Sequence, residues 1–108
     1  MSKLIQIIPR DDFRLFGAMV KKEIDLKSQG GAFYRSGSKK KNQAKWAHRN
    51  RRYKGWINLQ RSSGEVVVVE IQSRARPEDE WQLFHAFLGW LDRHFRENIQ
   101  AINIQYRE

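Results

Sequence analysis

The sequence predicts an α+β fold, with a single domain in which an antiparallel sheet carries two helices on one face. Two observations lead to this prediction. The chain has 108 residues, which is enough for one hydrophobic core and too few for two independent cores. Its apolar pattern also alternates between the two-residue repeat of strands and the three- and four-residue repeat of helices. We therefore treat residues 1–108 as one domain and assign its elements in chain order.

The first two elements are a strand and a helix. Residues 4–8 form a compact apolar run of the β type, and Pro9 ends it. Asp11 or Asp12 is expected to cap the helix that follows, which ends near Ser28, before a pair of glycines. The apolar residues that recur at steps of three and four, and so define the buried face of this helix, are Phe13, Phe16, Val20 and Ile24.

The middle of the chain carries the most regular β pattern. Residues 53–60 and 66–73 are rich in β-branched and aromatic side chains, which favour strands. The short turn between the two segments contains Gly64, a residue that tolerates the backbone angles of tight turns. These segments therefore predict a hairpin.

The second helix begins at Pro77, a residue that suits the first helical position, and three acids follow where the helix dipole favours negative charge. Its apolar residues occupy one continuous half of the helix surface, which predicts a core face packed on the sheet. They are Trp81, Leu83, Phe84, Phe87, Leu88, Trp90, Leu91 and Phe95. If this face also met a partner, the exposed residues would be Trp81 and Trp90 at its edges.

The last expected element is a strand over residues 99–106, along which apolar and amide side chains alternate. The resulting order is βαββαβ, the ferredoxin-like arrangement in which both helices lie on one face of an antiparallel sheet. The other face would be open and rich in amides, able to hydrogen-bond to bases, sugars or another chain, or simply solvated. Its expected residues are Gln6, Trp56, Asn58, Gln60, Glu70, Gln72, Asn103 and Gln105.

The net charge is concentrated between the first helix and the second expected strand. The chain has 21 Lys and Arg residues against 12 acids, a formal charge of +9. No acid lies between Arg35 and Lys54, so residues 31–54 are predicted to be a long basic loop inserted in the fold. Its cations are expected to contact phosphates: Arg35, Lys39, Lys40, Lys41, Lys45, Arg49, Arg51, Arg52 and Lys54.

Trp46, Tyr53 and Trp56 lie between these charges and are expected to stack on bases or anchor the ligand. Lys and Arg attract phosphates whatever the base sequence, and aromatic faces stack on unpaired bases. The segment therefore predicts a non-catalytic protein that binds nucleic acid, either DNA or RNA. The same charges would suit an inhibitor or immunity-type protein that plugs an acidic cleft on an enzyme. A homo-oligomer is compatible with both roles.

The stretch VVVVEIQS at residues 66–73 resembles the metal-binding strand of the restriction-endonuclease-like nucleases, whose signature is an acid followed by Glu-x-Lys. The resemblance implies a metal-binding role for Glu70, with Glu23 as an additional acid. This chain has Asn58 in place of the expected Asp and Gln72 in place of the expected Lys. Both changes remove groups that cleavage needs, so a divergent nuclease is the alternative and binding without cleavage is preferred.

Several other functional classes are not supported by the residue types. The chain has no Cys, which excludes disulfides, thiolate zinc sites and cysteine nucleophiles. The first residues contain only a short apolar run, so neither a secretion signal nor a membrane span is expected. We predict no catalytic residue, no metal, no other cofactor and no membrane contact, and a cytoplasmic location.

Overall fold

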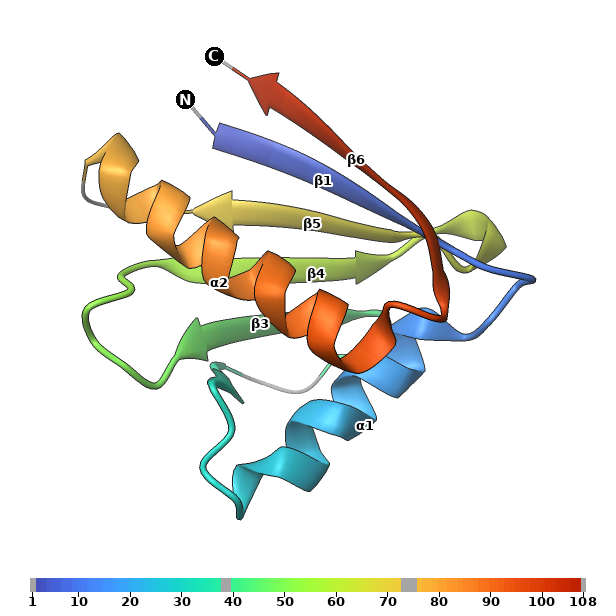
Figure 1. Ribbon diagram of the computed structural model, residues 1–108, viewed down its shortest axis with the longest axis horizontal. Helices are drawn as coiled ribbons and strands as arrows, with labels where there is room; N and C mark the ends of the chain where they lie inside the picture. Colours follow the sequence, from blue (N-terminus) through green and yellow to red (C-terminus); the bar gives the residue numbers. More distant parts are fainter. Residues whose placement is uncertain (1, 38–39, 73–75, 108) are drawn as a thin grey trace.

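A computed structural model describes residues 2–37, 40–72 and 76–107. Along the chain the elements are β1 (Ser2–Pro9), α1 (Leu15–Lys27), β2 (Phe33–Arg35), β3 (Gln43–His48), β4 (Trp56–Arg61), a short 3-10 turn (Ser63–Glu65), β5 (Val67–Gln72), α2 (Pro77–Phe95) and β6 (Ile99–Arg107). The six strands found in this part of the chain form one antiparallel sheet of order β2-β3-β4-β5-β1-β6 (Figure 1). The predicted single α+β domain is confirmed.

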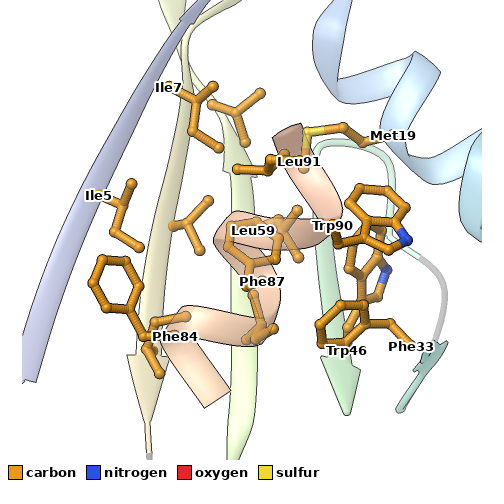
Figure 2. Close-up of a cluster of buried hydrophobic side chains, with 14 of the residues drawn as sticks. Ile5, Ile7, Met19, Phe33, Trp46, Leu59, Phe84, Phe87, Trp90 and Leu91 are labelled. Atoms are coloured by element: carbon orange, nitrogen blue, oxygen red, sulfur yellow. The ribbon is translucent and has the colours of Figure 1, made fainter. Parts of the chain in front are cut away.

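Both helices lie on the same face of the sheet (Figure 1), and the core fills the space between them and the strands. Side chains from neighbouring strands meet there because residues opposite each other share a face, as Ile5 and Val69 do. Figure 2 shows Met19 of α1 close to Trp90 and Leu91 of α2, so the two helices share one core. We call this side of the sheet the covered face.

The basic segment is not a loop, and this is the main correction to the predicted fold. Strands β2 and β3 both lie within residues 31–54, so the element order is βαββββαβ and the ferredoxin-like order does not hold. Alternation explains why residues 43–48 form a strand. Ala44 and Trp46 face the covered side, whereas Gln43 and Lys45 face the other.

Helix α1 ends as predicted, at Lys27 with Ser28 as its C-cap, but its start and its buried face differ from the prediction. Asp11 and Asp12 do not cap it, since both have positive φ in the preceding turn and the N-cap is Arg14, which makes no side-chain capping bond. The helix is also rotated from the predicted orientation. Ile24 is 56% exposed, and the residues buried along the helix are Leu15, Phe16, Met19 and Glu23.

The central hairpin and the second helix confirm their predictions. Strands β4 and β5 pair in register, with Asn58 opposite Glu70, and α2 begins at Pro77. Six of the eight predicted core residues of α2 are buried; Leu88 is half-buried and Trp81 is 49% exposed. Of the two tryptophans expected at the edges of this face, only Trp81 is therefore exposed. Among the described residues, no helix is long and apolar enough to cross a membrane.

One buried ion pair joins the N-terminal strand to the second helix. The Nζ atom of Lys3 on β1 lies 3.1 Å from Oε1 of Glu80 on α2, and both side chains are almost fully covered. The same ammonium group lies between 5.6 and 5.9 Å from the ring centroids of Trp81, Phe84 and Tyr106. These rings exclude water around the charge, so each partner depends on the other for its neutralisation.

Candidate nucleic-acid interface

The face of the sheet opposite the helices is lined with polar side chains. The strand register places Asn58 opposite both Lys45 on β3 and Glu70 on β5, so the three share this side. We call it the open face. Its described polar and aromatic residues are Gln6, Tyr34, Gln43, Lys45, Trp56, Asn58, Gln60, Glu70, Gln72, Asn103 and Gln105. They include all eight residues that the sequence predicted here.

The open face is hollowed where the β2–β3 turn meets the middle strands. The hollow has a volume of about 570 Å³, and the described residues that line it include two cations, Lys40 and Lys45. Asn58 Nδ2 donates to Gln72 Oε1 at 2.9 Å, and Gln72 Nε2 donates to Glu70 Oε1 at 2.8 Å. Each primary amide has two donor hydrogens and an acceptor oxygen, so this row has capacity for further bonds to a ligand.

A cation and an aromatic ring lie together beside this row of amides. The Nζ atom of Lys45 on β3 lies 4.7 Å from the ring centroid of Trp56 on β4, within the range of a cation–π contact. Lys45 is exposed and Trp56 is half-buried. The pair combines the two groups that single-stranded nucleic acids bind, a positive charge for phosphate and a ring for base stacking.

The predicted phosphate-binding cations are divided between the two ends of β3. Lys40 and Lys41 lie in the β2–β3 turn, before the strand begins, and Lys39 lies outside the described residues. The β3–β4 turn at the other end carries the exposed cations Arg49, Arg51, Arg52 and Lys54. Arg35 lies opposite Trp46, which places it on the covered side of β2. The structure therefore separates the cations that the sequence grouped in one loop, and leaves Lys40 and Lys45 at the open face.

The aromatic residues of the basic segment are also separated. Trp46 is only 1% exposed and packs against Phe33, Phe87 and Trp90 in the core (Figure 2), so the prediction that it stacks on a base is wrong. The residue belongs to the core because the alternation of β3 turns it toward the helices. Tyr53 is half-buried, with its ring 4.4 Å from the ring of His48. Of the three predicted aromatics, the strand register places Trp56 on the open face.

His48 is held in a neutral form at the end of β3. Its ring packs against Phe33, with centroids 5.0 Å apart, and burial lowers the pKa of the imidazole below its ordinary value of 6.5. Its Nδ1 atom accepts a hydrogen bond from the backbone N–H of Asn50 at 3.0 Å, which requires that atom to be unprotonated. The imidazole therefore supports the β3–β4 turn in its neutral state.

We expect His48 to make the fold less stable in mild acid. As pH falls through 6.5, the unfolded chain takes up a proton at His48 before the folded chain does, so the free energy of unfolding decreases. The limit is about 1.4 kcal/mol per pH unit for one group. His48→Asn retains an acceptor for the turn without titrating and should flatten this dependence between about pH 7.5 and 5.5, measured by urea unfolding. An unchanged slope in the variant would refute this role.

The carboxylates of the nuclease resemblance are not brought together. Glu70 lies on the open face and accepts from Gln72, whereas Glu23 is buried on α1, which packs on the covered face. The sheet separates them, so Glu23 is not an additional acid for Glu70. In the described ranges, no three His, Asp or Glu side chains are grouped so that they could hold a metal ion.

No family model, curated protein or solved structure matches this chain.

The predicted open face lacks three of its members, Tyr34 on β2 and Gln43 and Lys45 on β3. All three lie in residues 31–54, where the run of cations predicts a solvated loop. The signal that identifies the strand is the alternation of polar Gln43 and Lys45 with apolar Ala44 and Trp46. Its short length and the flanking Lys residues concealed it.

Proposed function

We propose that this protein binds single-stranded nucleic acid on its open face, without cleaving it. The observation that carries the proposal is the position of Lys45 over Trp56, beside the row of amides formed by Asn58 and Gln72. Unpaired bases present hydrogen-bonding edges that a duplex conceals, and short amide side chains on a sheet are suited to reach them. Lys40 at the edge of the same hollow supplies a second phosphate contact.

The charges at the ends of β3 extend this surface. A strand lying along β3 would pass from Lys40 and Lys41 at the β2–β3 turn toward Arg51 and Lys54 at the β3–β4 turn. Phosphate contacts of this kind give affinity without base preference, whereas the amides give the preference for particular bases. An acidic protein would be attracted by the same cations, and a competition experiment separates the two partners.

The test uses a short labelled oligo(dT) strand and fluorescence anisotropy at several salt concentrations. If about five phosphates are neutralised, a plot of the logarithm of the binding constant against the logarithm of the salt concentration should have a slope of about −3.5. Lys45→Gln should weaken binding several-fold and bring the slope closer to zero by about 0.7, because one phosphate contact is lost. Lys21→Gln removes an exposed charge from α1, away from the hollow of the open face, and serves as the matched control.

Three results would overturn the proposal. They are an affinity that does not depend on salt, no binding at about 50 mM salt, and equal losses in the Lys45 and Lys21 variants. A poly-glutamate competitor provides a further arm. Poly-glutamate and unlabelled oligo(dT) are compared at equal total charge. If both displaced the labelled strand equally well, the surface would recognise charge alone, and the acidic protein partner would become the better explanation.

A further inference from the structure

A second and larger hollow lies on the covered side of the sheet, between α1 and the β2–β3 turn. Its volume is about 880 Å³, which suits a small-molecule ligand. Its walls are apolar and aromatic, formed by Phe16 and Val20 of α1 and Trp46 of β3. The cations that line it are Arg14, Lys27, Arg35, Lys40, Lys41 and Arg61. We call it the α1 cavity.

An unusual carboxylate lines this cavity. Glu23 is only 5% exposed, and among the described residues it has neither a hydrogen-bond nor an ion-pair partner. None of the described buried polar atoms is both sealed from solvent and without a partner, so the oxygens of Glu23 keep some contact with solvent, and Glu23 is part of the cavity lining. The other acid of the lining, Glu65, is paired with Arg61. The Glu23 carboxylate is therefore available to accept hydrogen bonds from a ligand in the cavity.

The chemistry of the lining restricts the ligand. A covered carboxylate needs hydrogen-bond donors, and a carboxylate accepts best from two adjacent donors that reach both of its oxygens. The apolar walls favour a flat ring, and the surrounding cations favour an anionic group attached to it. A planar base with two neighbouring N–H groups and a phosphate satisfies all three requirements.

Among the standard bases, guanine alone presents two adjacent donors on its Watson–Crick edge, N1–H and the N2 amino group. Adenine and cytosine present one amino donor beside a ring-nitrogen acceptor, and uracil presents one donor between two carbonyl acceptors. An acceptor placed against the Glu23 carboxylate would be repelled and left without a partner. We propose that the α1 cavity binds a guanine nucleotide, with Glu23 accepting from N1–H and N2–H and the cations of the lining contacting the phosphate.

This inference rests on Glu23 and the cavity, and it is independent of the open face. The two sites are nevertheless adjacent, since Lys40 lines both hollows. The guanine nucleotide can come from two sources, a free mononucleotide or a guanosine within a bound strand. The experiment separates them, and the oligo(dT) used to test the open face contains no guanine, so the two proposals can fail independently.

The first measurement is calorimetric titration of the 108-residue chain with GMP, AMP, CMP and UMP. GMP is expected to bind at least about tenfold more tightly than the other three, because only GMP satisfies both oxygens of Glu23. Glu23→Gln, which replaces one acceptor oxygen by a donor amide, should abolish this preference. Circular dichroism and thermal unfolding establish that the variant is folded.

A second variant blocks the cavity without altering Glu23. Gly17 lines the cavity on α1, and a Cβ added there would meet no atom within 4 Å, so Gly17→Phe can extend into the space. Gly89→Phe is the matched control, because Gly89 is an equally unobstructed helical glycine on α2 that does not line the α1 cavity. Gly17→Phe should abolish GMP binding, and Gly89→Phe should leave it unchanged.

The source of the base is identified by adding one guanosine to the oligo(dT) strand. If the added guanosine tightens strand binding and Glu23→Gln removes that gain, the ligand is a guanosine within a strand. If GMP binds but the added guanosine does not tighten strand binding, the ligand is the free nucleotide. Absence of GMP binding would overturn the proposal. Equal affinities for GMP and AMP, unaffected by Glu23→Gln, would also overturn it, because the cavity would then recognise phosphate alone.

Discussion

Replacing Trp46 by Ala is expected to reduce the free energy of unfolding by about 3 to 5 kcal/mol, a large part of the stability of a domain of this size. The indole is one of the largest fully buried side chains of the core. Its ring centroid lies 5.1 Å from that of Trp90 and 6.1 Å from that of Phe33 (Figure 2). Truncation removes these contacts and leaves a space that rigid neighbours cannot fill. Urea unfolding followed by circular dichroism measures the loss.

Trp56→Ala is the matched control, because Trp56 is half-buried on the open face and touches Lys45 rather than the core. Its cost in stability should be much smaller, while its cost in oligo(dT) affinity should be about 1 to 3 kcal/mol if a base stacks on the ring. The opposite pattern, a stable Trp46 variant with impaired strand binding, would mean that residues 43–48 do not form the strand described above.

The second large effect is expected at the ion pair between β1 and α2. Lys3→Met should destabilise the fold by about 3 kcal/mol, because it leaves Glu80 charged, nearly buried and without its partner. The contact of Lys3 with Trp81, Phe84 and Tyr106 is preserved in part, since the methionine side chain is apolar and similar in length. Chemical unfolding of the single variant gives the size of the effect.

A double variant separates the cost of an unpaired charge from the value of the pair. Lys3→Met combined with Glu80→Leu should recover most of the lost stability, because two apolar side chains replace two charges in an apolar site. The exposed pair Arg96–Asp92 is the control: its N–O distance is 3.0 Å, yet Arg96→Met should change stability by no more than about 0.5 kcal/mol. A double variant as unstable as Lys3→Met alone would contradict this account.

The parts of the fold that the sequence predicted correctly carry long and regular periodicity. Helix α2 has apolar residues over half its surface for 19 residues, with Pro77 marking its start. The β4–β5 hairpin combines β-branched residues with a turn at Gly64, where φ is positive. In both elements, the local secondary-structure preference agrees with the pattern of buried residues, so the sequence alone is sufficient to predict them.

The errors occurred where tertiary contacts outweigh local signals. The buried face of α1 includes the charged residue Glu23 and excludes the apolar Ile24, and a pattern of hydrophobicity cannot anticipate either. Strands β2 and β3 are short, and their sequence is dominated by charge. Strand β2 pairs with β3, and β3 pairs with β4, so their strand structure depends on cross-strand pairing that the composition of each segment does not reveal.

The candidate sites were predictable to different degrees. The open face follows from the alternation of side chains along the strands. Because Val69 points to the core, Glu70 and Gln72 have to face the other side of the sheet. The α1 cavity was not predictable, because its walls come from α1, β3 and the β2–β3 turn. Only the folded chain brings the acceptors of Glu23 and the cations around them together.

The sheet order also determines when each strand can be paired as the chain is made. The neighbours of β1 are β5 and β6, so that Ile5 lies between Val69 and Ile104, and Ser2 pairs with Arg107. The strands β3, β4 and β5 join sequential neighbours through short connections and can form early, whereas β1 pairs with β5 and β6 across much longer loops. The apolar run of β1 therefore has no partner strand until β5 has been made. This delay exposes an aggregation-prone segment until β5 emerges, and the other edge of β1 stays uncovered until β6 follows.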